Sequence, residues 1–366
     1  MNIEYNLTAY KSAVQEKKEK KAILFMGFDY RYTGNSRYLF EEMLQKDVDN
    51  LYFVTEDERV DEKYRIEPES KKMYEIFYQA KIIIFETWTE KTWIKTEDTI
   101  WIQLWHGTPL KKMLLDSEEA EIAKVNPYHQ IEKLIEINKW NYLLIDNPNV
   151  YPYFKSSCLI DKSKILECGY PRVKYLIDNK ENSELKKSIK KKAGIPEDKK
   201  VVLYLPTWRD YNYGVEEEKI DYSYFPDMNK LKNVLGDDYV IVSKNHVFLN
   251  NKDKDSITNV STETQELLLI GDYLISDYSS VIFDAFAIDL PVALLANDFE
   301  KYQQSRGVYE SIWNDLLPFV GYNEEEVANI IQNYNVNTEE YKNVKTKFSY
   351  SNNEQSLADF ILNIRK

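Results

Sequence analysis

The stretch TIWIQLWHGTPLKK, residues 99–112, indicates how this chain folds. Its first seven residues are mostly apolar, which is typical of a buried β-strand. Gly107 and Pro109 mark a sharp turn directly afterwards. His106, one of three histidines in the chain, stands between the strand and the turn. The stretch therefore predicts a buried strand whose end presents an imidazole.

Short apolar runs of this kind recur along the chain and alternate with longer amphipathic segments. In the first half the runs are residues 22–28, 50–55, 81–87, 99–105 and 141–146, with 164–171 closing the series. In the second half they are residues 200–207, 238–246, 272–277 and 290–296. Helical patterns lie between them, such as residues 35–46 and 183–196, the second with a stop at Gly194. The alternation predicts βαβ units and parallel sheets.

The length of 366 residues exceeds what one ordinary core holds, so we expect two domains. The predicted architecture is α/β, with two parallel-sheet halves that face each other across a cleft. We place the first domain at residues 1–182 and the second at residues 183–340. Residues 341–366 are expected to end in a helix that packs back toward the first domain. Ligands of such sheets bind at the carboxyl ends of the strands.

The net charge of −13 is opposite to that of a typical nucleic-acid-binding protein. Positive charge is local, at residues 17–21, 111–112 and 186–192. These lysines are either solvated helix faces or basic spots that dock on an anionic membrane surface or hold phosphates. The charge pattern therefore argues against a nucleic acid partner.

The cysteines and the N-terminal residues bear on the cellular compartment. Cys158 and Cys168 form no disulfide framework or zinc motif, which fits a reducing cytoplasm. Residues 1–21 carry charges where a signal peptide needs an apolar core. No apolar run approaches the ~20 residues that a membrane span needs. We expect a cytoplasmic protein that is soluble or peripheral on a membrane.

Two histidines follow predicted strands. His106 is a candidate general base, because a neutral imidazole near pH 7 can take a proton from an attacking hydroxyl. The alternative is a structural histidine at a strand end. His246 ends another predicted strand, and Lys244 lies two residues earlier on the same side of an extended chain. Together these two suit a phosphate or pyrophosphate, although such a pair also arises by chance.

A second candidate site lies in the stretch LISDYSSVIFDAFAIDLP, residues 274–291. A strand runs into a group of four polar residues, and a helix follows; the four are Ser276, Asp277, Ser279 and Ser280. Hydroxyls and free N–H groups at a helix N-terminus form a ready anion site. The alternative is an ordinary helix N-cap. Asp284, one turn further on, is positioned to accept hydrogen bonds from ribose hydroxyls.

Two arginines complete the candidate set. Arg209 follows a predicted strand and could reach the same phosphates, or could form a surface ion pair with Asp210. Arg306 precedes Gly307 in a predicted loop.

The sequence has no metal motif at a strand end, no His/Cys cluster with ligand spacing, no nucleophile elbow and no Walker-type loop. We therefore expect phosphate chemistry that uses side chains and a helix dipole, without a bound metal or cofactor.

Taken together, these segments resemble the CDP-glycerol glycerophosphotransferases of teichoic acid synthesis. The resemblance rests on motifs that occur in the order and spacing of that family. They are QLWHGTPLKKM (103–113), NPNVYPYF (147–154), ILECGYPRVKYL (165–176), VVLYLPTWRD (201–210), KNH (244–246), ISDYSSVIFDAF (275–286) and NDFEKYQQSRGVY (297–309). The combination of WHGTPLK with DYSSVIFD is specific.

The resemblance implies a GT-B-like fold of two Rossmann-like domains and a CDP-glycerol donor, or CDP-ribitol in relatives. His106 would be the base, while His246, Ser279 and Ser280 would hold the donor pyrophosphate. Gly107 and Thr108 of the same motif as His106, with Lys244, are further candidates for substrate binding. The acceptor implied is a lipid-linked saccharide or a polyol-phosphate chain at the inner membrane face.

Some positions depart from the pattern of the family. Lys244 stands where arginine is frequent, Val247 where proline is frequent, and Cys168 where threonine is commoner; Met113 and Leu114 stand where glycine often follows LKK. These changes bear on donor selectivity.

The short chain matches the size of glycerol-phosphate primases. The alternatives are a ribitolphosphotransferase, a capsule polymerase, a GT-B nucleotide-sugar glycosyltransferase, or a binding protein with a decayed site. The intact set of His106, His246 and Ser279 argues against the last of these.

Overall fold

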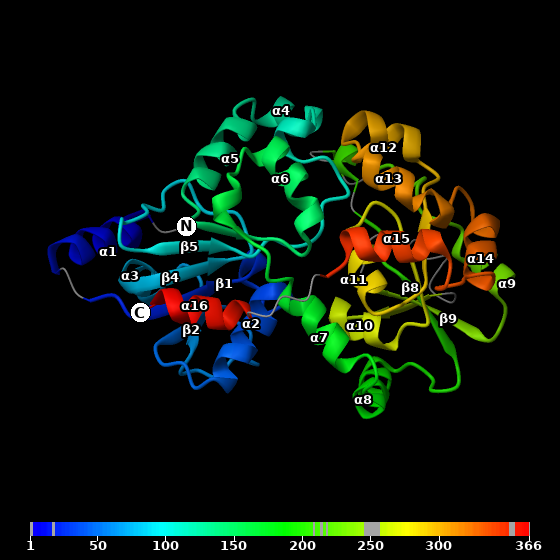
Figure 1. Cartoon of the computed structure of the whole chain (residues 1–366), viewed down its shortest axis with the longest axis horizontal. Helices are drawn as coiled ribbons and strands as arrows, with labels where there is room; N and C mark the ends of the chain where they lie inside the picture. Colours follow the sequence, from blue (N-terminus) through cyan, green and yellow to red (C-terminus); the bar gives the residue numbers. More distant parts are fainter. Residues whose placement is uncertain are drawn as a thin grey trace. The chain divides into compact units, whose positions relative to one another are not determined.

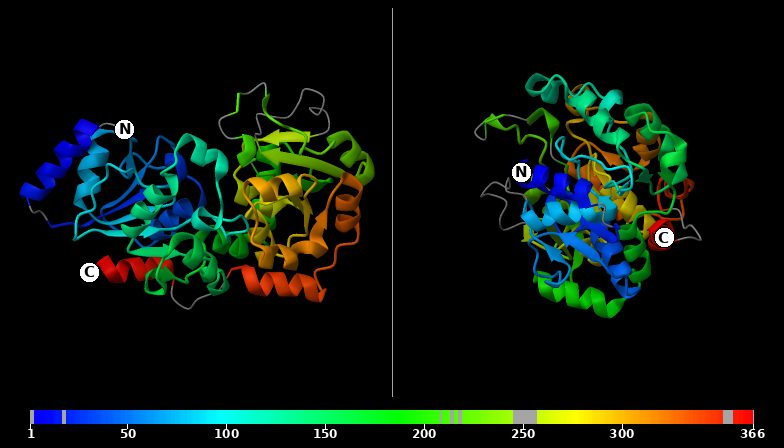
Figure 2. Two further views of the ribbon diagram at one scale, coloured as in Figure 1. Left: turned by 90° about the horizontal axis from the view of Figure 1, so that it is seen from above. Right: turned by 90° about the vertical axis from the view of Figure 1, so that its left-hand side faces the viewer.

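The computed structural model describes residues 3–16, 19–207, 209–212, 215–216, 219–244, 257–350 and 356–365. The chain forms two compact units, each built around a parallel sheet. The first unit comprises Met1–Gly107, Gln130–Tyr175 and Ser351–Lys366, and the second comprises Thr108–His129 and Leu176–Tyr350. Both chain ends belong to the first unit, as Figure 2 shows. Each unit therefore combines segments that lie far apart in the sequence.

The described sheet of the first unit has seven strands, all parallel (Figure 1). Their order is β3 (Arg65–Ile66), β2 (Leu51–Val54), β1 (Ala22–Met26), β4 (Ala80–Phe85), β5 (Ile100–Gln103), β6 (Tyr142–Leu144) and β7 (Ile165–Leu166). Strand β1 pairs with β2 and β4 on its two sides, and every residue of it is buried. A strand buried on both faces needs apolar side chains throughout, which explains the run AILFM.

Helices pack around this sheet. They are α1 (Ile3–Glu16), α2 (Gly34–Gln45), α3 (Lys71–Gln79), α5 (His129–Asn138), α6 (Tyr151–Cys158) and α16 (Leu357–Arg365). Helix α1 packs on α3, and α3 lies against β1 and β4. The C-terminal helix α16 packs on α2, next to it in Figure 1. Asp359 of α16 pairs with Lys46 (2.9 Å), and the Phe360 ring meets Tyr142 edge-on.

The described sheet of the second unit has six parallel strands. Their order is β10 (Ile257–Val260), β9 (Tyr239–Lys244), β8 (Lys200–Tyr204), β11 (Tyr273–Ser276), β12 (Val292–Leu295) and β13 (Val320–Gly321). The helices are α4 (Ala120–Val125), α8 (Ser183–Ala193), α9 (Met228–Leu235), α10 (Thr264–Ile270), α11 (Val281–Ala287), α12 (Phe299–Ser305), α13 (Glu310–Leu316), α14 (Glu324–Gln332) and α15 (Glu339–Phe348). Helix α7 (Pro171–Asn179) contains the boundary between the units.

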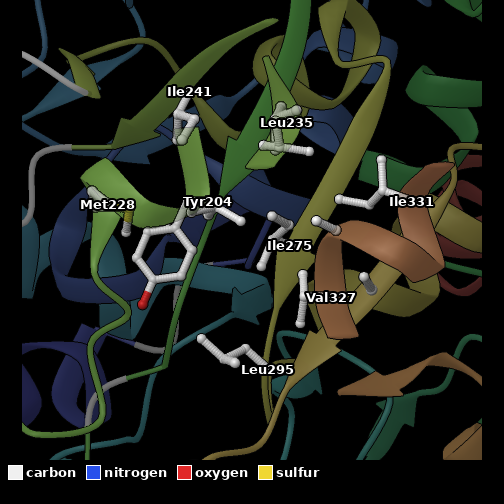
Figure 3. Close-up of a cluster of buried hydrophobic side chains, with 12 residues drawn as sticks. Tyr204, Met228, Leu235, Ile241, Ile275, Leu295, Val327 and Ile331 are labelled. Carbon is white, nitrogen blue, oxygen red and sulfur yellow. The ribbon is translucent and has the colours of Figure 1, made fainter. Parts of the chain in front are cut away.

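A cluster of buried apolar side chains joins the second sheet to helices α9 and α14 (Figure 3). Ile275 of β11 and Leu295 of β12 face this cluster from the sheet. Val327 and Ile331, one turn apart on α14, and Leu235 of α9 pack in the same cluster. The spacing of four residues places both α14 side chains on one helix face, so a single apolar stripe fixes the helix on the sheet.

The parallel α/β fold predicted from the sequence is confirmed, since each predicted apolar run overlaps an observed strand. The helix predicted at residues 183–196 is α8, and Gly194 caps it with φ +69°. Three strands were missed: β3, β10 and β13. Strands β3 and β13 have two residues each, and β10 has the sequence ITNV. Such short or half-polar segments carry no periodic pattern.

Candidate active site

His106 lies in the first unit, three residues after β5 ends at Gln103. Its side chain is exposed, whereas the flanking Trp105 and Gly107 are buried. The indole of Trp105 stacks on the imidazole, with ring centroids 4.7 Å apart and planes at 20°, and the ring of Phe28 meets it edge-on at 5.8 Å. The structure thus places an accessible, oriented imidazole at the carboxyl end of a buried strand, where the sequence predicted it.

The backbone around His106 is bonded to side chains of the same unit. Trp105 has φ +55°, a left-handed conformation that bulky residues rarely adopt. Its N–H donates to Gln103 Oε1 (3.0 Å), and its carbonyl accepts from Asn35 Nδ2 (3.0 Å). The carbonyl of His106 accepts from Arg172 Nη1 (2.9 Å). Neither Asn35 nor Arg172 was identified from the sequence, although Arg172 lies in the quoted GYPR motif.

Residues 108–129 belong to the second unit, and the first of them pack on the loop before Tyr309. Lys111 forms a β-bridge with Val308, and the N–H of Lys112 donates to the carbonyl of Gly307 (3.0 Å). Thr108 is 1% exposed, with its hydroxyl 3.5 Å from the carbonyl of Phe348. The motifs at residues 103–113 and 297–309 therefore meet in part, which the sequence alone did not indicate.

Arg306 ties these two segments together. Its Nε donates to the carbonyl of Lys112 (2.8 Å), and its Nη1 pairs with Glu119 Oε1 (2.9 Å). The Ser117 hydroxyl donates to the Arg306 carbonyl (2.9 Å). These contacts give Arg306 a structural role, and its predicted contact with substrate stays a prediction.

The polar group after β11 splits into an inward and an outward pair. Ser276 is buried, and its hydroxyl donates to the carbonyl of Leu205 (2.6 Å). Asp277 is also buried. Ser279 and Ser280 are partly exposed at the start of α11, and Ser279 Oγ accepts from the N–H of Val281 (3.3 Å). The two outward hydroxyls are thus the ones available to a ligand.

Asp284, proposed from the sequence as a ribose acceptor, lies on α11 and is only 2% exposed. Its carboxylate is therefore turned into the second unit. The predicted contact with ribose would require this buried carboxylate to reach the ligand. The contact stays a prediction, and the burial of Asp284 does not support it.

Arg209 occupies a buried ionic cluster at the carboxyl ends of β8, β11 and β12. Its side chain is 1% exposed; Nη1 pairs with Asp277 (2.6 Å), and Nε and Nη2 pair with Asp298 (2.7 and 3.1 Å). The guanidinium lies over the rings of Tyr224 and Tyr278, with centroids at 4.2 and 4.9 Å. Burial lowers the pKa of the Arg209 guanidinium, but the carboxylates of Asp277 and Asp298 together raise it by more. The pKa therefore lies above its ordinary value, and the guanidinium stays charged.

This cluster changes how Arg209 and Asp277 are interpreted. The sequence offered a phosphate contact or a surface ion pair with Asp210, and the structure instead gives buried pairs with Asp277 and Asp298. Sequence reasoning assigned no role to Asp298, although it lies in the quoted NDFEKY motif, three residues after β12. Asp277 also accepts from the N–H of Thr207 (2.9 Å). The cluster therefore holds three strand-end loops together.

The remaining candidates lie at the end of β9. Lys244 Nζ donates to Thr264 Oγ1 (3.3 Å). His246 lies in residues 245–256, outside the described residues, so its position is not tested. Among the residues that the structure describes, no group of three or more His, Cys, Asp or Glu side chains could hold a metal ion.

The chain is similar to proteins of one family along nearly its whole length. Residues 8–356 match the family model described as CDP-Glycerol:Poly(glycerophosphate) glycerophosphotransferase. A teichoic acid poly(glycerol phosphate) polymerase of Staphylococcus epidermidis is 30% identical over 318 residues, which cover 82% of this chain and 44% of the relative. A teichoic acid glycerol-phosphate transferase of Staphylococcus aureus is 29% identical over 359 residues, which cover 94% of this chain and 92% of the relative. The chain thus spans less than half of the first relative.

Among solved structures, the chain is similar to a variant of the wall teichoic acid polymerase TagF soaked with CDPG. The TM-score is 0.84 at 25% sequence identity, and the similarity covers 99% of this chain and 93% of that one. Because both units are covered, the GT-B-like fold expected from the sequence is supported at the level of the whole chain.

Proposed function

Because the chain belongs to the CDP-glycerol:poly(glycerophosphate) glycerophosphotransferase family, we propose that it transfers glycerol phosphate from CDP-glycerol to an acceptor hydroxyl and releases CMP. The reaction would serve teichoic acid synthesis, as the names of its relatives suggest. The observation that carries the proposal is the exposed imidazole of His106, held on Trp105 at the carboxyl end of β5. Strand ends of this kind are where α/β proteins bind ligands.

In the proposed reaction His106 acts as general base. It takes the proton of the acceptor hydroxyl, whose oxygen forms a bond to the phosphorus that bears glycerol. The bond between that phosphorus and the bridging oxygen breaks, and CMP leaves with the electron pair. An exposed imidazole suits this role, because the ordinary pKa of histidine lies near neutral pH and the ring can accept a proton there.

We assign the donor pyrophosphate to groups of the second unit. Ser279 and Ser280 offer partly exposed hydroxyls, and Lys244 offers a cation at the end of β9. His246 completes the proposed set by resemblance to the family. Fixed donors and cations aimed at the leaving phosphate stabilise the charge that develops there. The buried cluster of Arg209 would support this site indirectly, by holding the loop that carries the serines.

The substitution His106→Ala tests the assignment. General base catalysis contributes on the order of 10²–10⁴-fold, so kcat should fall by that much while the affinity for CDP stays nearly unchanged. His129→Gln is a matched control, because His129 pairs with Glu119 (3.4 Å) and does not stand at a strand end. CMP release from CDP-glycerol, CDP titration and thermal melting measure the three properties.

Two results would contradict the proposal. A folded His106→Ala protein with near-normal kcat would remove His106 as the base. Release of UDP from a UDP-sugar, with no CMP released from CDP-glycerol, would show a glycosyltransferase on the same fold.

We also propose a lipid-linked acceptor and peripheral binding to an anionic membrane. No helix within the described ranges is long and apolar enough to span a membrane. Helix α1 exposes Ile3, Leu7 and Val14, which are 55%, 44% and 51% exposed, beside the exposed Lys11. Residues 123–135 likewise expose apolar side chains, with Val125 at 68%. Apolar and basic groups together favour the interface of anionic lipids.

Co-sedimentation with vesicles tests the membrane proposal. Binding should be stronger to anionic than to neutral vesicles and should weaken with salt, since attraction is worth ~1 kcal/mol per basic residue near the surface. Val14→Glu, which puts a charge into the exposed stripe of α1, should weaken it. Equal, salt-insensitive binding to both kinds of vesicle would count against the proposal.

A further inference from the structure

The turn that presents His106 depends on side chains for its shape. The left-handed φ of Trp105 (+55°) is strained for a large residue, so the surrounding structure must hold it. Gln103 accepts from the N–H of Trp105 through Oε1 (3.0 Å), and its Nε2 donates to the carbonyl of Thr87 (3.0 Å). The entry to the turn is therefore tied to the segment that follows β4.

The carbonyl side of the turn is held by Asn35 and Arg172. Asn35 Nδ2 donates to the carbonyl of Trp105 (3.0 Å), and Arg172 Nη1 donates to the carbonyl of His106 (2.9 Å). The two residues are linked, since the N–H of Arg172 donates to Asn35 Oδ1 (3.3 Å). They are 0% and 7% exposed. Both peptide planes that flank the Cα of His106 are thus fixed by buried donors.

Glu86 in turn fixes Asn35. Its Oε1 accepts from the N–H of Asn35 (2.9 Å), and its Oε2 accepts from the N–H and the hydroxyl of Ser36 (2.8 and 2.7 Å). The buried carboxylate therefore caps α2 and sets the position of its first residues. Gly34 leaves room for it, because a Cβ there would lie 2.3 Å from Glu86 Oε1.

We propose that Asn35 and Arg172 are positioning residues for His106, and that Glu86 holds Asn35 in place for this purpose. The inference rests on the proposed function, in which His106 is the base. A base must lie within hydrogen-bond reach of its proton, and a misplacement of ~1 Å can cost ~10²-fold in rate. Loss of either donor frees the backbone at His106 but leaves β5 and the apolar core intact.

Arg172→Met is the main test, because methionine keeps the unbranched stem and removes the donors. We expect kcat to fall roughly 10- to 100-fold, with the KM for CDP-glycerol changed less than about twofold, since the pyrophosphate groups are assigned to the second unit. Arg172→Lys, which keeps a positively charged donor group at the end of the side chain, should recover part of the loss. Arg365→Met is the matched control, because Arg365 also donates to backbone carbonyls of the first unit, those of Lys21 and Asp49.

A second readout needs no turnover. The chain has three histidines, so the imidazole Cε1–H signal of His106 is assigned by its loss in His106→Gln. Stacking on Trp105 at 4.7 Å shifts this signal by the ring current of the indole. In Arg172→Met the signal should move toward that of a free imidazole, whereas in Arg365→Met it should stay. If Arg172→Met fails to fold, Asn35→Asp replaces it, because aspartate keeps the acceptor for Arg172 and removes the donor to Trp105.

The two readouts separate the possible failures. An inactive wild-type protein whose His106 signal still moves in the variants would overturn the proposed function and uphold the positioning. An active wild-type protein whose rate and His106 signal are both unchanged in Arg172→Met or Asn35→Asp would overturn the positioning. A fall in kcat together with a shifted signal supports both.

Discussion

Both units bury a carboxylate directly after a strand of a parallel sheet, but they balance its charge differently. Glu86 follows β4 and is 3% exposed; its oxygens accept from the N–H groups of Asn35 and Ser36 and from the Ser36 hydroxyl. Asp277 follows β11 and is 2% exposed; it is paired with Arg209, which also binds Asp298. One carboxylate is held by dipoles at a helix start, and the other by a buried cation.

The difference separates two ways of fixing a strand-end loop. Dipoles act only at short range and in the right direction, so Glu86 specifies backbone geometry, which suits a turn that must aim one imidazole. A buried ion pair acts more strongly but depends on complete charge balance, because each ion has lost its hydration. The second unit uses buried ion pairs to join three loops, while the first unit uses directed hydrogen bonds to fix one turn.

The largest expected effect is that of Arg209→Met. It leaves Asp277 and Asp298 buried without their cation, and breaking a buried pair in this way costs about 3–5 kcal/mol of unfolding free energy. Urea unfolding followed by tryptophan fluorescence measures the loss. The control is Lys342→Met, which removes an exposed pair with Glu339, where the side chains are 56% and 90% exposed; it should cost less than ~1 kcal/mol. Equal costs for the two variants would show that the buried cluster contributes little.

A smaller effect is expected from Gly34→Ala, compared with Gly194→Ala. Both glycines have a left-handed φ, +66° and +69°, so alanine strains each by ~1 kcal/mol. At Gly34 the new Cβ also meets Glu86 Oε1 at 2.3 Å, whereas at Gly194 nothing lies within 4 Å. Overpacking adds about 1–3 kcal/mol, so Gly34→Ala should be the more destabilising by that amount in urea unfolding. If the two variants match, the carboxylate of Glu86 is not held tightly by the start of α2.

The sequence predicted the sheets well because their centres are apolar throughout. Runs such as AILFM and KIIIF need burial on both faces, and a parallel sheet covered by helices provides it. The order of the strands was not predictable, because pairing depends on contacts between residues far apart in the chain. The two-residue strands β3 and β13 are too short to show a periodic pattern of side chains.

For the site, the sequence predicted which residues stand at strand ends but not which way they point. His106 is exposed, as expected, whereas Arg209, Asp277 and Asp284 are turned inward. The supporting residues were missed because each acts across a long separation. Asn35 contacts a carbonyl 70 residues away, and a polar residue near a helix start gives no signal of such a partner.

The smallest expected effect concerns pH and distinguishes the two carboxylates directly. Burial raises the pKa of Glu86 above its ordinary value, although the hydrogen bonds from Ser36 and Asn35 and the positive charge of Arg172 lower it. Between the ordinary and the raised pKa, the folded state binds more protons than the unfolded state, so the unfolding free energy contributed by Glu86 falls as pH rises. Each unit of pKa difference corresponds to about 1.4 kcal/mol.

Glu86→Gln removes this titration, and its amide can accept at only one of the two oxygen positions. The variant should therefore be less stable than the wild type, by a margin that is largest near the ordinary pKa of glutamate and narrows as the pH rises above it, because only the wild type loses stability when Glu86 ionises. Urea unfolding of both proteins across this range measures the margin, and Glu56→Gln, at an exposed position of the same unit, should track the wild type. A margin that widens with pH would mean that the donors of α2 stabilise the ionised carboxylate more than burial penalises it. In that case Glu86 would be held as an anion, and the two units would differ only in the groups that contact the buried carboxylate.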